Sequence, residues 1–238
     1  MRGTGRLWSV LVDAFRRRLT FENREGTQSL VLVILVWYSI QVGVVYLGWS
    51  VERLQWAFTT ESFPQLSPGL VLAIISHDLP PNVTHILGNV AFLWLFAGES
   101  EQHMRRIEVV GFFVVTALVS VTVSTVLTGD STLGASGGAL AFVGFYGTHL
   151  YLTQWDSAEL DAMDRAWREP LKLRVCWRVA IVVSPLALVG YAVGQYIGLV
   201  PAGRTDVIGH LVGVVLGVGY AVGRRWIARW CGATMASL

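Results

Sequence analysis

Long apolar stretches separated by short polar connections dominate the chain and predict membrane-spanning helices. A helix needs roughly 20 apolar residues to cross a hydrocarbon core of about 30 Å, and six segments come close to that length. They lie at about 29–49, 82–98, 107–127, 135–154, 175–198 and 206–223. The second is short, but Pro80 and Pro81 mark its start clearly. The pattern predicts an all-α membrane protein built as a bundle of six transmembrane helices.

The apolar stretches divide the chain into a basic N-terminal segment (1–28), a bundle (29–223) and a tail (224–238). In the first segment, apolar residues recur at helical spacing beside Arg16–Arg18, which favours an amphipathic helix on the membrane surface. A frayed basic tail is the alternative. The long 50–81 connection carries several aromatic residues and is expected to lie partly in the membrane surface.

Composition supports a membrane protein. The chain has 238 residues, of which 53% are hydrophobic and 14% charged, and its mean hydropathy is +0.54. A soluble domain carries about a quarter charged residues. The two cysteines, Cys176 and Cys231, form no Cys-x-x-Cys motif and indicate neither a disulfide framework nor a metal site.

Basic residues orient the bundle because Lys and Arg concentrate on the cytoplasmic side. Sixteen of the 18 basic residues fall in the N-terminal segment, the second-to-third and fourth-to-fifth connections and the C-terminal tail. Only Arg53 and Arg204 fall on the other side. Both termini are therefore expected in the cytoplasm, and an even number of spans agrees with this.

Strongly polar side chains inside spans are costly, so each one suggests a functional site. His85 and Asn89 lie four residues apart in the second span and share one helix face. Ser136 opens the fourth span within "GASGG", and His210 lies about one turn into the sixth. Taken singly, each has a structural explanation: a hydrogen bond between helices, or small-residue packing.

The depth of these residues in the membrane favours a shared functional site over separate structural roles. The second, fourth and sixth spans run in the same direction, and each carries its polar group within two turns of its outer end. We therefore expect His85, Asn89, Ser136 and His210 at one level, just below the outer surface.

These residue types suit acyl transfer. A serine hydroxyl is a weak nucleophile until a base removes its proton, and His210 can be that base and then the acid. The side chains of His85 and Asn89, with the backbone N–H of Ser136, are suitable donors for an oxyanion. Asp206 precedes His210 by four residues but is better interpreted as a helix N-cap.

The motifs resemble those of the rhomboid intramembrane serine proteases over about residues 56–217. The second span carries H-x-x-x-N (His85 and Asn89) and is followed by G-x-x-E; the fourth carries G-x-S-G; the sixth carries H-x-x-G-x-x-x-G. The other matching positions are Gly98, Glu101, Gly134, Ser136, Gly137, His210, Gly213 and Gly217.

The resemblance implies a six-helix rhomboid-type bundle with a Ser136–His210 dyad, an oxyanion site that includes His85 and Asn89, and no cofactor or metal. It implies that the partners are transmembrane protein substrates in the lipid bilayer, cut near their outer ends, and not nucleic acid. The sequence leaves the oligomeric state open. A prokaryotic cell membrane is the expected location.

The chain departs from the family pattern at three places. Many members have an aromatic residue four after the serine, where this chain has Leu140. Members often have a histidine five residues before the position of His85; here Pro80 occupies it, and His77 lies eight before, with no role assigned to it. The 155–174 connection is long and charged, typical of a solvated amphipathic helix.

Two other functions compete with proteolysis. One is a non-proteolytic, rhomboid-like binding or quality-control factor, although such relatives typically lose the serine or the histidine. The other is a membrane haem protein with His85 and His210 as ligands, which leaves Ser136 and the motif spacing unexplained.

Overall fold

The computed structural model describes residues 23–60, 67–80, 82–154, 190, 197 and 206–230. In these ranges the elements, in chain order, are α2 (Glu25–Tyr46), α3 (Val51–Phe58), α4 (Gly69–Leu72), η1 (Ala73–Ile75), α5 (Thr84–Phe92), η2 (Leu93–Ala97), α6 (Gly98–Ser100), α7 (Arg106–Thr128), α8 (Ser136–Gln154) and α11 (Val207–Trp230). No strand occurs among the residues described. The amphipathic helix expected before residue 23, the 155–174 connection and the fifth span expected at 175–198 lie outside the continuously described ranges.

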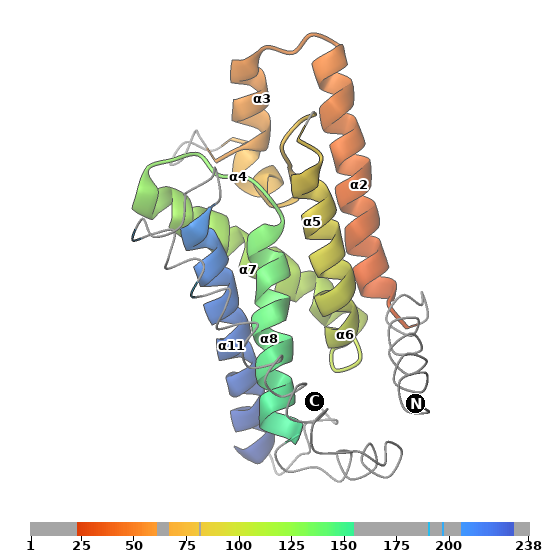
Figure 1. Ribbon diagram of the computed structural model, residues 1–238, viewed down its shortest axis with the longest axis vertical. Helices are drawn as coiled ribbons and strands as arrows, with labels where there is room; N and C mark the ends of the chain where they lie inside the picture. The colour runs from red at the N-terminus through yellow and green to blue at the C-terminus, as the bar shows by residue number, and fades with distance from the viewer. Residues whose placement is uncertain are drawn as a thin grey trace, which may run out of the picture.

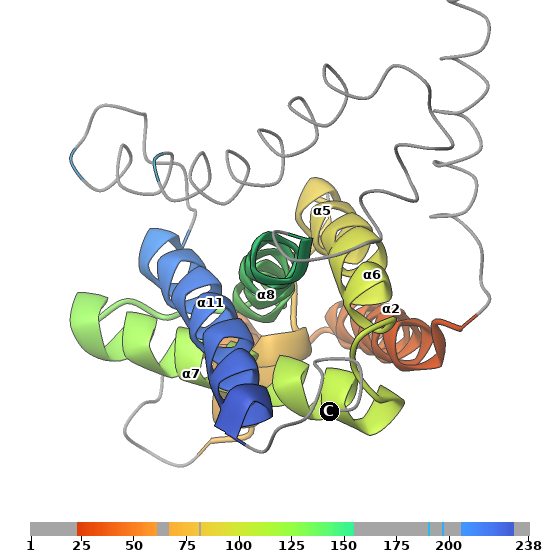
Figure 2. The same ribbon diagram turned by 90° about the horizontal axis from the view of Figure 1, so that it is seen from below.

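Helix α8 is the centre of the bundle. It packs against α11, α7 and the α5–η2 stretch, and Figure 2 shows these helices arranged around it. Every residue from Gly137 to Phe145 is buried, although several are only glycine or alanine. Small residues let neighbouring helices approach closely, which is how helices associate where lipid removes the hydrophobic drive between them.

The outer surface is apolar and the interior holds many of the polar groups. On α2, Leu32, Val33 and Val36 are exposed, whereas Thr27 and Gln41 are buried. This distribution suits a lipid environment. Within the described part, α2, α7 and α11 are each long and apolar enough to cross a membrane. The predicted all-α membrane bundle is therefore confirmed.

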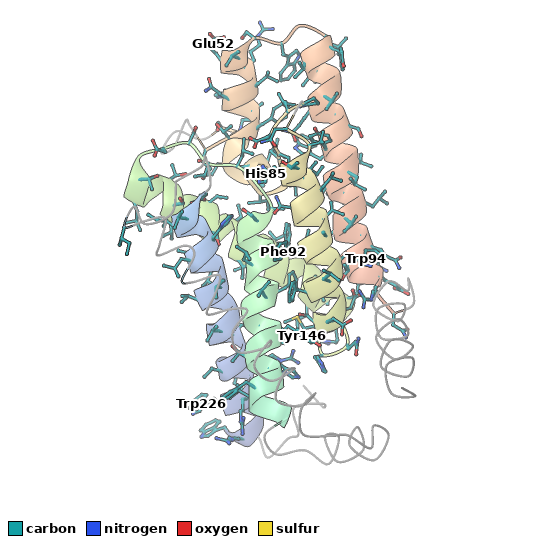
Figure 3. The ribbon with its side chains drawn as sticks, in the orientation of Figure 1. Glu52, His85, Phe92, Trp94, Tyr146 and Trp226 are labelled. Carbon is teal, nitrogen blue, oxygen red and sulfur yellow. The ribbon has the colours of Figure 1, made fainter. Side chains whose placement is uncertain are left out.

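The second predicted span is a continuous helix with an irregular middle. Its turns change from α-helical in α5 to π-helical in η2 and back in α6. Beside this stretch the buried guanidinium of Arg24 donates to the Trp94 carbonyl oxygen at 2.8 Å and pairs with Glu99 at 2.7 Å. A Cβ at Gly98 would collide with the same guanidinium. Figure 3 shows Trp94 beside the start of α2. The apolar pattern alone predicted neither this π-helical segment nor the buried cation beside it, which is about 70 residues away in the sequence.

The carboxylate of Glu101 caps the beginning of α2. It accepts hydrogen bonds from the backbone N–H of Gly26 at 2.6 Å, the backbone N–H of Thr27 at 2.9 Å and the Thr27 hydroxyl at 2.8 Å. The first N–H groups of a helix have no partner within it, and the positive end of the helix dipole favours an anion. Glu101 therefore ties α2 to the connection before α7.

Replacing Glu101 by alanine should lower the free energy of unfolding by about 1–2 kcal/mol, the usual cost of a lost helix cap. Glu25→Gln, at the same helix end, is the matched control. Its ion pair with Arg106 is largely exposed, and such pairs contribute roughly 0–1 kcal/mol. Thermal unfolding in detergent measures both variants, and equal losses would mean that Glu101 is not a cap.

Candidate active site

The candidate site lies where α5, α8 and α11 begin, at one end of the bundle that we call the site end (Figure 1). Ser136 is the first residue of α8, His85 the second of α5 and His210 the fourth of α11. Asn89 lies one turn further along α5. The four residues singled out by sequence thus occur in the first two turns of three neighbouring helices.

The loop that delivers Ser136 is held by buried hydroxyl groups. Thr60, after α3, donates its backbone N–H to the Thr132 carbonyl at 3.1 Å and accepts the Thr132 N–H on its hydroxyl at 2.8 Å. Thr125 of α7 lies within hydrogen-bond distance of both hydroxyls. Closer to the serine, the Gly134 N–H donates to the Ala73 carbonyl at 2.8 Å. Elements far apart in sequence therefore fix where α8 begins.

Gly134 separates His85 from Ser136. Its φ of +126° is a backbone conformation that suits glycine. A Cβ added there would lie 3.0 Å from His85 Nε2 and 3.6 Å from Ser136 Oγ. One edge of the His85 ring, marked in Figure 3, and the serine hydroxyl therefore both border the space over Gly134. Ser136 itself is only partly buried.

Helices α8 and α11 meet backbone to backbone. A Cβ at Gly213 would collide with the carbonyl oxygen of Gly137, and one at Gly217 with that of Ala141. At the site end, the Gly209 carbonyl oxygen lies 3.5 Å from the Cβ position of Gly137. Ser136 precedes Gly137 and His210 follows Gly209, so this contact brings the serine and histidine positions together.

Asn89 presents an unused donor. It is 5% exposed, and its Nδ2 has no hydrogen-bond partner among the described residues. A buried amide N–H without a partner is costly. Such a group is suited to bind an oxygen that arrives with a ligand or develops charge during a reaction.

His77 also lies at the candidate site, beside His85, although the sequence assigned it no role. Its ring is buried and lies 5.3 Å from the His85 ring, centroid to centroid. Its backbone N–H donates to Gln41 Oε1 at 3.1 Å. Burial, with the charge of His85 as second cause, lowers the pKa of His77 to about 4, so the ring is neutral at physiological pH. Because the loop across Asp78–Pro80 is irregular, the spacing of the two histidines in the sequence does not predict that their rings are close.

Asp206 caps α11, as the sequence predicted. Its Oδ1 accepts the backbone N–H of Gly209 at 2.7 Å and the hydroxyl of Ser124 at 2.5 Å. Its carbonyl oxygen accepts the first intrahelical bond, from the His210 N–H at 3.1 Å. Together with His85, Asp206 is one of the titratable groups that act electrostatically on His210.

If Ser136 and His210 act as a catalytic pair, Asp206→Asn should keep most of the cleavage activity, because the asparagine oxygen can still accept the Gly209 N–H and asparagine is an equally good cap. Initial cleavage rates within about 3-fold of wild type are expected, whereas loss of a triad carboxylate would cost about 10⁴-fold. A loss of that size would make Asp206 a partner in proton transfer and not only a cap.

Leu140 occupies the position where the pattern of the resembling family often has an aromatic residue, and its own cluster is mostly aliphatic. It is buried in a small cluster with Val143 of α8 and Val214 of α11, flanked by Phe96. The α8–α11 contact is therefore filled here by branched side chains.

Among the described residues, no group of three His, Cys, Asp or Glu side chains could hold a metal ion.

The fold and the site define a class of protein: a helical membrane protein whose candidate site lies at one end of an apolar bundle. A family model described as the Rhomboid domain matches residues 69–226, which run from α4 into α11. The chain belongs to the rhomboid family. A search of curated proteins found no match. The matched range contains the positions of the candidate site residues, and the match supports an intramembrane protease at the level of the family.

Proposed function

We propose that this protein is an intramembrane serine endopeptidase that cuts the transmembrane segments of other proteins with a Ser136–His210 dyad. The observation that carries the proposal is the backbone contact of α8 with α11, where Gly137 faces Gly209 and Gly213. Because the serine and the histidine are the sequence neighbours of these glycines, the contact holds a nucleophile and a base on adjacent first turns.

The chemistry follows from these groups. His210 removes the proton from Ser136 Oγ as that oxygen attacks the substrate carbonyl carbon. The carbonyl oxygen gains negative charge, and Asn89 Nδ2, His85 Nε2 and the Ser136 N–H donate to it. The C–N bond then breaks as His210 returns the proton to the leaving amine. Water, activated by the same histidine, hydrolyses the acyl-enzyme and frees the serine.

The distribution of basic residues supports one orientation of the protein in the membrane. The described basic residues at the end opposite the site include Arg24, Arg105, Arg106, Arg224 and Arg225. Because positive charge concentrates on the cytoplasmic side, the site end faces outward and substrates are cut near their outer ends. Both termini are then cytoplasmic, in what we propose is a prokaryotic cell membrane.

Reconstitution tests the proposal. The purified full-length chain and a single-span model protein are placed in liposomes, and mass spectrometry locates any new chain ends. Wild type should cut within the outer part of the span, and Ser136→Ala should not. Stable binding of the model protein by wild type without any cut would favour a non-proteolytic rhomboid-like factor instead.

A further inference from the structure

An acidic side chain faces one of the site histidines from the loop before α5. Asp78 Oδ2 lies 3.3 Å from His85 Nδ1. That nitrogen is buried and makes no aligned hydrogen bond within the described part of the chain. The separation exceeds the roughly 2.7–2.9 Å of a charge-assisted hydrogen bond. The contact is therefore electrostatic in this structure, and a small movement of either side chain would turn it into a hydrogen bond.

The loop holds the Asp78 carboxylate at this place. The Asn82 side-chain amide donates to Asp78 Oδ2 at 2.8 Å, and the Thr84 hydroxyl donates to Asn82 Oδ1 at 2.7 Å. The chain of contacts runs from the first residue of α5 through the loop and back to His85 on the same helix. Although the Asp78 side chain is 44% exposed, its orientation is determined by these partners.

The two edges of the His85 ring face different groups. Nδ1 faces Asp78, and Nε2 borders the space over Gly134 beside the Ser136 hydroxyl. An imidazole that carries hydrogens on both nitrogens can donate to a carboxylate on one side and to an oxyanion on the other. The neighbouring titratable groups are His77, which is neutral, His210 on α11 and Asp206, which caps that helix. Asp78 is the carboxylate at the Nδ1 edge.

We propose that Asp78 is a positioning residue that orients the His85 ring and keeps hydrogens on both of its nitrogens, so that Nε2 donates to the oxyanion. This inference rests on the proposed protease function. Partners of this kind behind a functional histidine fix its ring orientation and the placement of its hydrogens. Asp78 touches neither the substrate nor the serine and acts only through His85.

Cleavage kinetics provide the first test. Asp78→Asn should lower kcat about 10- to 100-fold with KM nearly unchanged, because an oxyanion donor acts in the transition state. Asp78→Glu should restore most of that loss. In a His85→Ala background, Asp78→Asn should cost nothing more. Asp130→Asn, at another exposed aspartate in the α7–α8 loop, is the matched control and should match wild type.

A spectroscopic test is independent of activity. The chain has five histidines, so ¹⁵N-histidine NMR at neutral pH can resolve His85 by comparison with His85→Ala. Wild type and Asp78→Glu should show two hydrogen-bearing ring nitrogens at His85, and Asp78→Asn should show one. Thermal unfolding confirms that each variant is folded.

The two tests separate the possible failures. The role of Asp78 would be overturned if the His85 signals are unchanged in folded Asp78→Asn. It would also be overturned if Asp78→Asn lowers kcat equally with and without His85. In both cases wild-type cleavage would still stand. A KM increase without a change in kcat would make Asp78 a substrate-binding group and overturn the inference equally. If wild type does not cleave, the proposed function fails and the catalytic role of Asp78 fails with it, whatever the NMR shows.

Discussion

Ser136→Ala and His210→Ala should each lower the rate of substrate cleavage on the order of 10³-fold or more. Without Ser136 Oγ no acyl-enzyme can form. Without His210 the hydroxyl keeps its proton and the leaving amine receives none. Initial rates of cleavage of a single-span protein in liposomes measure both losses.

The double variant sharpens this prediction. Residues that act as one unit show strongly non-additive losses, so Ser136→Ala with His210→Ala should be no slower than either single variant. Ser39→Ala is the matched control, because that serine lies on the exposed face of α2 and its hydroxyl donates to the Leu35 carbonyl of the same helix. Additive losses, or cleavage retained by the serine variant, would contradict the dyad.

Gly213→Ala should have the second large effect, on stability and activity together. The added Cβ would meet the Gly137 carbonyl oxygen, and a backbone group cannot swing aside as a flexible side chain can. Forcing helices apart at a packed contact costs about 2–3 kcal/mol. The same displacement moves His210 away from Ser136, so cleavage should fall more than the folded fraction does.

Gly219→Ala on the same helix is the control for this substitution. A Cβ at Gly219 would meet nothing within 4 Å, and alanine is favoured over glycine in a helix by about 1 kcal/mol. This variant should be as stable as wild type or more so. Unfolding in detergent and cleavage in liposomes are measured on both variants. A Gly213→Ala protein as stable and active as Gly219→Ala would contradict the close packing.

Much of the fold could be predicted because it depends on local properties of the chain. The apolar runs that became α2, α7 and α11 are visible without any knowledge of their neighbours. The same holds for the N-cap at Asp206, whose partner Gly209 is three residues away. Helical periodicity likewise places His85 and Asn89 on one face.

Other features could not be predicted because their partners are distant in sequence or are joined by an irregular loop. The Arg24–Glu99 pair and the Glu101 cap of α2 each join residues about 75 positions apart. The place of His77 beside His85 could not be predicted, because the loop that returns it to His85 follows no helical period. The Asp78–His85 contact crosses the same loop and follows no helical period either.

The amino-acid sequence by itself determined that this chain is a helical membrane protein of the rhomboid type, and it named the serine and histidines of the candidate site. Hydropathy and motif spacing suffice for this because each is a property of one segment. Only the tertiary structure decided how those segments meet: where α11 rests on α8, which residues anchor the loop before Ser136, and which carboxylate faces His85. The relative depth and rotation of two helices depend on where their backbones can touch. Glycines such as Gly137 and Gly213 permit that contact, but the contact involves both helices and so is not a property of either segment alone.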